Sequence, residues 1–309
     1  MYNIILLFLS IMSENNNSYL STKLDHFSAW KKERKIALIF SLIILGITFF
    51  LVGYGMINNR QEFVVDKFYF ISFSNYFQNF SVFFYLTYQS NLIYGLVLFS
   101  FVLRPSRLKF QFLFVFTVIL TIVLIVFWTV IAWNLHMDIT FLLKTSTVHF
   151  FHPVFSIFVL FWFRKEFMVN RLGLSLAVIY SVCYYLFCLL LYFFTIRQWI
   201  SPEFKVNNEN IPEKRSVFFY TGLTIYPFLN FLHPFFYSGD NHSMVILLNL
   251  LMSFSVVLLP YWISLFYINV FGIKALNWSF FAWVKSLFIR LKNFFWVAKP
   301  KKEENFGEK

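Results

Sequence analysis

The sequence predicts an all-α polytopic membrane protein, folded as a single helical bundle. Of the 309 residues, 59% are apolar and 13% are charged, whereas about a quarter of the residues in a soluble domain are charged. Several apolar runs exceed the ~20 residues that a helix needs to cross a bilayer. Lysine and arginine gather in alternate connections between these runs. These features exclude a soluble globular domain and a disordered chain.

Six apolar runs bounded by charge predict six transmembrane helices, which form one domain over residues 36–271. The first run follows a basic segment, the second ends before Arg104, and the third begins after Lys109. The fourth opens with two histidines, the fifth holds both cysteines, and the sixth follows a segment broken by prolines. The predicted spans are residues 36–57, 80–103, 110–135, 145–163, 172–196 and 243–271.

The flanking segments differ from the spans in composition. Residues 1–35 are predicted to be a basic tail, in which the first dozen residues are too short to span and Met12 is an alternative start. Residues 272–298 interleave aromatic residues with Lys285, Arg290 and Lys292. This pattern predicts a basic amphipathic helix that lies on the cytoplasmic membrane surface. Residues 299–309 are polar and are predicted to be disordered.

The distribution of positive charge predicts the orientation in the membrane. Of the 26 lysines and arginines, 19 lie in the two tails and in the second-to-third and fourth-to-fifth connections. Cytoplasmic segments are enriched in these residues, so both termini are expected in the cytoplasm of a cell-membrane protein. Membrane lipids are the expected partners. Their anionic headgroups account for the net charge of +12 without a nucleic-acid partner.

Two polar clusters lie inside the predicted spans, both in the outer third of the membrane. In the fourth span, His149 and His152 are three residues apart and share a helix face. The cluster in the second span consists of Thr87, Gln89, Ser90 and Asn91. Polar groups are costly in lipid, so both clusters are candidates for function. The apolar segment from Thr224 to Pro234 holds two prolines and is predicted to be re-entrant or to lie on the outer surface.

Three short motifs carry a family resemblance. Residues 85–92 are Tyr-Leu-Thr-Tyr-Gln-Ser-Asn-Leu, and His149 stands four residues before Pro153. Tyr226 begins a Tyr-Pro-Phe-Leu stretch that is followed by Asn230. These motifs resemble those of the androgen-induced-gene family of integral membrane threonine hydrolases and their uncharacterised bacterial six-helix relatives. Bacterial members carry an acidic residue at the position of Asn230, and an Asp-Trp pair where this chain has only Trp162.

The resemblance implies that Thr87 is a nucleophile and His149 its base. Animal members of the family hydrolyse fatty-acid esters of hydroxy fatty acids, so the resemblance implies a lipid-ester hydrolase that needs no cofactor. A threonine hydroxyl becomes nucleophilic when a neighbouring neutral imidazole removes its proton. Asn91 or Gln89 could donate hydrogen bonds to the oxyanion. The hypothesis requires Thr87 and His149 to lie within hydrogen-bond distance.

Other interpretations of these residues remain open. The Thr87 hydroxyl could bond the carbonyl one turn earlier, as in many membrane helices, and both histidines could make interhelical hydrogen bonds. The histidines could also bind a metal, although H-x-x-H alone is a weak signal. The other outer-side candidates for such a site are His136, Asp138, His233, Asp240 and His242. A non-enzymatic protein that binds a lipid or another substrate, such as a transport component, is the broader alternative. The sequence does not predict the oligomeric state.

Overall fold

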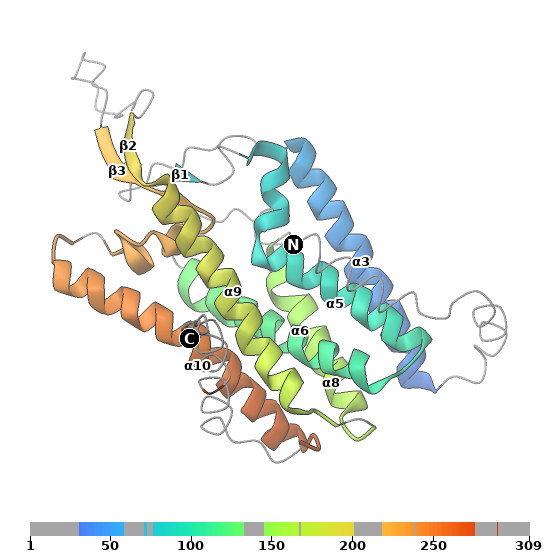
Figure 1. Ribbon diagram of the computed structural model, residues 1–309. Helices are drawn as coiled ribbons and strands as arrows, with labels where there is room; N and C mark the ends of the chain where they lie inside the picture. The colour runs from blue at the N-terminus through green and yellow to red at the C-terminus, as the bar shows by residue number, and fades with distance from the viewer. Residues whose placement is uncertain are drawn as a thin grey trace, which may run out of the picture.

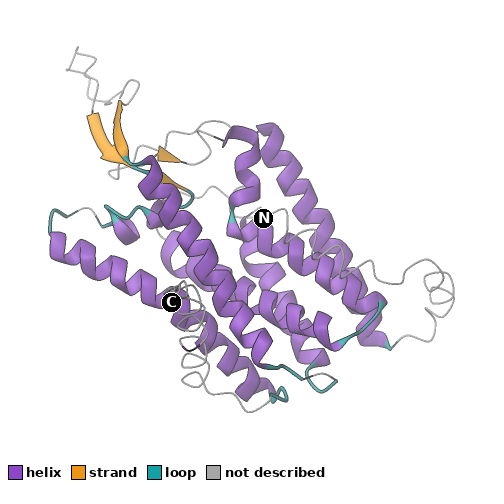
Figure 2. Ribbon diagram, viewed as in Figure 1, coloured by secondary structure: helices purple, strands orange, loops and turns teal. Residues whose placement is uncertain are grey.

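The structure is a computed structural model that describes residues 31–58, 71–72, 77–132, 145–166, 168–200, 218–237, 239–275 and 289. In this part of the chain the helices lie side by side in a bundle, and short strands extend from one end (Figure 1; Figure 2). Five helices are long and apolar enough to cross a membrane. The predicted class of an all-α, multi-span protein is therefore confirmed.

The five long helices correspond to five of the predicted spans. They are α3 (Lys32–Asn58), α5 (Leu86–Leu103), α6 (Arg107–Val126), α9 (Arg171–Thr195) and α10 (His242–Phe271). A π-helical turn, η3 (Phe127–Ile131), extends α6. The predicted span over residues 145–163 is a shorter segment, Thr147–Phe163, made of the π-turn η5 (Thr147–Phe151) and α8 (His152–Phe163). This segment falls short of the ~20 residues of a typical crossing.

Side-chain caps fix the start of three long helices. Ser106 accepts a hydrogen bond from the Lys109 N–H at the start of α6, and Asn170 accepts one from the Gly173 N–H at the start of α9. Asn241 caps α10 in the same way. These caps satisfy N–H groups that have no partner within their own helix.

The second predicted span is broken, which corrects its expected start near Phe80. A 3-10 helix, η2 (Gln78–Phe84), comes first, and α5 begins only at Leu86. Between them Tyr85 is extended, with φ −71° and ψ 125°. Thr87 was expected seven residues inside a continuous helix. It lies instead in the first turn of a new one.

The core is built around α6, which contacts α5, α8, α9 and α10, while α3 packs on α5. Gly95 allows the close approach of α3 to α5, because a Cβ atom there would lie 2.8 Å from a methyl group of Leu45. Phenylalanines supply much of the packing: Phe101, on α5, makes an edge-to-face contact with Phe163, on α8. Bulky side chains therefore fill the interior of this bundle.

The helix termini that carry lysine and arginine side chains lie together at one end of the bundle. The Arg34 guanidinium donates to the carbonyl oxygens of Val102 and Leu103 at 2.6 and 2.9 Å, which joins the start of α3 to the end of α5. The Val169 N–H donates to the Lys274 carbonyl at 2.9 Å, which joins the start of α9 to the end of α10. We call this the cationic end. Its described cations include Arg34, Lys35, Arg104, Arg107, Lys109, Arg164, Lys165, Arg171 and Lys274.

The opposite end carries short strands and turns. Strand β1 (Ile71–Ser72) pairs in parallel with β4 (Leu223–Thr224). Strands β2 (Arg197–Ile200) and β3 (Phe218–Thr221) form an antiparallel pair beyond α9. Two 3-10 turns follow, η6 (Pro227–Leu229) and η7 (Pro234–Phe236), and they join the strands to α10. The segment predicted to be re-entrant or external thus consists of two proline-initiated 3-10 turns at this end. We call residues 225–237 the cover segment.

Several sequence predictions fall outside the described residues. They concern the N-terminal tail up to residue 30, nearly all of the amphipathic segment 272–298, and the terminal residues 299–309. His136 and Asp138 also lie outside the described part of the chain.

Candidate active site

Thr87 and His149 come together although 62 residues separate them in the chain. The Thr87 Oγ1 atom lies 3.1 Å from the His149 Nε2 atom. Thr87 is buried in the first turn of α5, and His149 is the central residue of η5. The distance meets the condition that the sequence hypothesis set for this pair.

The partners of the His149 ring assign its tautomer. The Nδ1 atom lies 2.9 Å from the Thr145 carbonyl oxygen, which can only accept a hydrogen bond. Nδ1 therefore carries the proton, and the lone pair on Nε2 accepts the proton of the Thr87 hydroxyl. The ring also stacks on Phe127, with centroids 4.0 Å apart. These contacts orient the imidazole as a base directed at Thr87.

The π-helical geometry of η5 accompanies this arrangement. Such single turns insert one residue into a helix and are frequent at functional sites. Here the turn places His149 against the end of α6, where η3 provides Phe127. The pair is therefore held between two irregular turns that extend otherwise regular helices.

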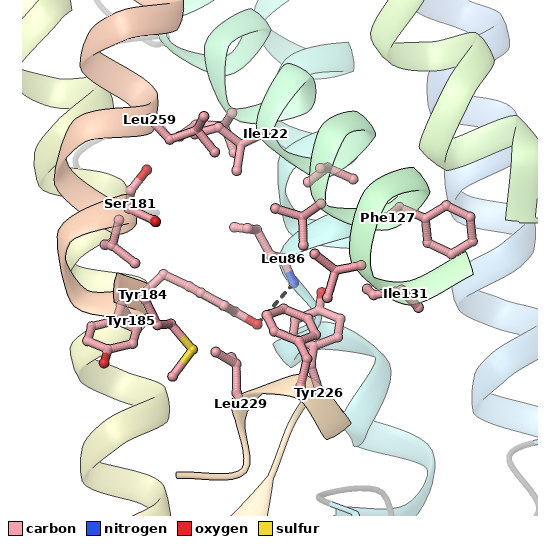
Figure 3. A pocket seen from close by; sticks show the side chains of 18 of the residues that line it. Leu86, Ile122, Phe127, Ile131, Ser181, Tyr184, Tyr185, Tyr226, Leu229 and Leu259 are labelled. Carbon is pink, nitrogen blue, oxygen red and sulfur yellow. Dashed lines mark hydrogen bonds between the residues drawn. The ribbon is translucent and has the colours of Figure 1, made fainter. Parts of the chain in front are cut away.

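The break before α5 exposes the N-terminus of that helix next to Thr87. The Leu86 N–H donates to the Tyr184 hydroxyl at 3.1 Å (Figure 3). The same hydroxyl donates to the Phe84 carbonyl at 2.8 Å, so Tyr184 bridges the break. The first N–H groups of a helix and its dipole favour negative charge at this position. An anion that formed at Thr87 would lie close to these groups.

Tyr226 brings a second hydroxyl to Thr87 from the cover segment. Both residues line the same cavity. Burial raises the pKa of the Tyr226 hydroxyl, and its interaction with Thr87 opposes part of this shift. The hydroxyl therefore stays protonated and can act as a donor.

Asn91 and His152 hold the two active elements together. The Asn91 Nδ2 donates to the Thr87 carbonyl at 2.7 Å and to the Val148 carbonyl at 3.3 Å. The Asn91 Oδ1 atom accepts from His152 Nδ1 at 2.8 Å. Both side chains are fully buried. Asn91 therefore binds the backbone of the candidate nucleophile and of the residue before the candidate base.

The other supporting residues take structural roles. The Gln89 amide donates to the Phe83 carbonyl at 2.7 Å, across the break before α5. Ser90 donates to the Thr87 carbonyl at 3.1 Å. The amide groups of Gln89 and Asn91 both bind backbone carbonyls in this conformation, and the expectation that either one donates to an oxyanion stays a prediction.

Asn230 is not brought to Thr87 and His149. Its Oδ1 atom accepts from the Tyr192 hydroxyl at 2.9 Å and from the Leu232 N–H at 3.2 Å. The residue is buried and ties the cover segment to α9. Its neighbour Tyr226 reaches the pair instead.

An apolar cavity of about 160 Å³ adjoins the pair. Thr87 and His149 both line it, and the walls come from α6, α9, α10 and the cover segment (Figure 3). Apolar side chains of α6 and α10 contribute two facing parts of the wall. Those residues are Ile119, Ile122, Val123, Val126, Met252, Val256 and Leu259. The arrangement places the candidate nucleophile and its candidate base at the side of an apolar cavity.

The metal hypothesis gains no support from the described residues. Among them, no group of three or more His, Cys, Asp or Glu side chains converges on a common point. His149 and His152 also bind different partners through their Nδ1 atoms.

Sequence reasoning missed three residues of the site. Tyr184, Phe127 and Thr145 contribute a cap, a stacking surface and a carbonyl. Each stands in an apolar or unremarkable stretch, so only the position of Tyr184 among the aromatic residues of the fifth span could have drawn notice.

Comparison with protein-family models, curated proteins and solved structures gives no match for this chain. The resemblance to the androgen-induced-gene family therefore stays a prediction.

Proposed function

We propose that this protein is a membrane-embedded hydrolase of lipid esters, with Thr87 as nucleophile and His149 as general base. One observation carries the proposal. The Thr87 hydroxyl lies 3.1 Å from an imidazole nitrogen whose lone pair is directed at it. Thr121 and Thr129 show the ordinary pattern of a membrane helix, in which the hydroxyl bonds the carbonyl one turn back, at 2.8 and 2.7 Å. Thr87 differs from them in having a base as its partner.

The proposed reaction has two steps. In the first, Thr87 Oγ1 bonds to the ester carbonyl carbon while its proton passes to His149 Nε2. The ester C–O bond then breaks, and His149 gives this proton to the departing alcohol. In the second, water attacks the acyl-threonine, its proton passes to Nε2, and the acid leaves as the proton returns to Oγ1. The balance is ester and water to acid and alcohol.

The oxyanion of each tetrahedral intermediate needs donors near Thr87. The Tyr226 hydroxyl is the candidate donor on the wall shared with Thr87, and the dipole at the start of α5 also favours negative charge there. Donors fixed in a water-poor site stabilise developing charge strongly, and removing one costs about 10²–10³ in rate.

The orientation in the membrane and the number of crossings are part of the same proposal. We place the cationic end in the cytoplasm, which puts both termini there and the catalytic pair near the outer leaflet of the cell membrane. In this arrangement Thr147–Phe163 forms the sixth, short crossing, and residues 272–298 lie as an amphipathic helix on the inner surface, where their cations meet anionic headgroups.

A fluorophosphonate probe, which reacts covalently with activated hydroxyls, tests the proposal on the purified protein. We expect labelling of the wild type to disappear in Thr87→Val, which keeps the side-chain shape, and in His149→Ala. Matched controls are Thr129→Val, a threonine with an ordinary carbonyl partner, and His242→Ala, an exposed histidine at the start of α10. Both controls should label like the wild type.

Two results would contradict the proposal: no labelling of a folded wild type, or labelling that Thr87→Val leaves unchanged. Either one favours a protein that binds lipid in this cavity without hydrolysing it, as its apolar walls also allow.

A further inference from the structure

The cavity has a polar side and an apolar deep end. On α6, Phe127 stacks on His149, and Ile119 lies eight residues nearer the cationic end. At the rise of an α-helix this is about 12 Å. Figure 3 shows Ile122 and Leu259 side by side at this deep end, while Tyr226 lies at the other. The cavity therefore extends from the catalytic pair toward the membrane interior.

The few hydroxyls in the walls away from the catalytic pair have partners in the protein. Ser181 donates to the Ala177 carbonyl at 3.1 Å, and Ser255 donates to the Leu251 carbonyl at 2.7 Å. The Tyr185 hydroxyl lies 2.9 Å from the Ser253 hydroxyl. A ligand in the deep part therefore meets hydrocarbon and has no polar group to satisfy, which suits an unbranched acyl chain.

The size of the cavity limits the length of that chain. A cavity of about 150 Å³ with aliphatic and aromatic walls holds benzene, a ligand with six carbons. The present cavity of about 160 Å³ therefore accommodates a segment of similar size. Ile119 and Pro260, both buried in the fold, are part of its lining.

From this geometry we infer that the cavity is an acyl-chain pocket that selects esters of short acids, of about six carbons, with Ile122 and Leu259 as its floor. The inference rests on the proposed function for the position of the ester carbonyl beside Thr87. Binding of the chain does not depend on the reaction, so the two can be tested separately.

The binding test uses Thr87→Val protein in detergent and two methyl esters that carry a diazirine at the chain end. One is a six-carbon and the other a sixteen-carbon ester. On illumination, the six-carbon probe should crosslink to peptides of α6 and α10 that contain Ile122 and Leu259. We expect at least a tenfold loss of this crosslink in Leu259→Trp, which fills the floor. Leu258→Trp is the matched control, because Leu258 is 42% exposed on the outer face of the same helix.

The kinetic test uses the catalytically intact protein and p-nitrophenyl esters of two to sixteen carbons. We expect kcat/KM to rise about fourfold for each added methylene, as burial of a methylene predicts, and to fall beyond about six carbons. Leu259→Trp should move the optimum to shorter chains. Leu259→Ala should move it to longer ones by about three carbons, the number that the substitution removes.

The outcomes separate the two proposals. Crosslinking at the floor without ester hydrolysis retains the pocket and rejects the hydrolase. Hydrolysis with the same chain-length profile in Leu259→Trp, Leu259→Ala and the wild type rejects the pocket and retains the hydrolase. Equal crosslinking of the floor by the sixteen-carbon probe also overturns the length limit.

Discussion

At the scale of single residues, the site depends on hydrogen bonds to backbone atoms more than on contacts between side chains. The orientation of His149 comes from the Thr145 carbonyl, and the spacing of the pair comes from Asn91, which binds two carbonyls. Polar groups in a buried network are worth most when every partner is present. Loss of Asn91 should therefore displace the pair as well as weaken the fold.

Replacement of Asn91 by Ala leaves His152 Nδ1 and the Val148 carbonyl without this partner. We expect the free energy of unfolding to fall by about 2–3 kcal/mol and fluorophosphonate labelling of Thr87 to slow by about 100-fold, since small misplacements are costly in catalysis. Thermal unfolding can be followed by a thiol-reactive dye that reports exposure of Cys188, which is 3% exposed in the fold, in a Cys183→Ser background.

Ser90→Ala is the control for this change. Ser90 donates to the same Thr87 carbonyl but holds no second element. We expect it to cost about 0.5–1 kcal/mol, since one hydrogen bond within the helix is lost, and to leave labelling near the wild-type rate. Equal effects of the two substitutions on labelling would show that Asn91 contributes only to stability.

At the scale of elements, the break between η2 and α5 is the feature that creates the site. Hydropathy predicts one continuous span here, because residues 80–86 are mostly apolar and contain neither proline nor glycine. The break depends on Tyr184, which lies 98 residues away from Leu86 and bonds on both sides of Tyr85. A tertiary contact of this kind leaves no local signal in the sequence.

Tyr184→Phe tests the bridge. It removes the acceptor of the Leu86 N–H and the donor to the Phe84 carbonyl, and we expect a loss of about 1–2 kcal/mol in unfolding free energy. Labelling of Thr87 should fall at least tenfold because the first turn of α5 is no longer fixed. Ser253→Ala, on α10, loses an exposed bond with the Tyr185 hydroxyl and one to the Asn249 carbonyl, and serves as control. If the two variants label Thr87 equally fast, the bridge does not position the nucleophile.

The remaining elements divide into those that sequence can predict and those that it cannot. The long helices follow from hydropathy, and the meeting of Thr87 with His149 followed from short motifs that carried a family resemblance. The walls of the cavity cannot be predicted from the sequence, because Ile122 and Leu259 resemble all other apolar positions of a membrane helix. Burial in lipid and burial in protein require the same residue types, so only the packing of α6 against α10 distinguishes them.

At the scale of the whole molecule, the cationic end and the pair of Thr87 and His149 lie at opposite ends of the bundle. Arg34 and Lys109 bond carbonyl oxygens at the end of α5, so their charges belong to the structure of the cationic end as well as to its surface. Thr87 and His149 lie where α5 begins, at the other end of the same helix. The orientation in the membrane would therefore decide from which side water reaches the proposed acyl-threonine.

Cysteine accessibility in intact cells measures that orientation. Pro105→Cys places a thiol in the exposed connection between α5 and α6 at the cationic end, and Asp240→Cys places one before α10 at the other. Both substitutions are made in a background without Cys183 and Cys188. We expect a membrane-impermeant maleimide to label the cysteine at 240 in intact cells, and the one at 105 only after permeabilisation, because 19 of the 26 lysines and arginines fall in the segments predicted to be cytoplasmic, which include residue 105. The reverse pattern would place Thr87 and His149 toward the cytoplasm, so that the acid and alcohol would be released inside the cell.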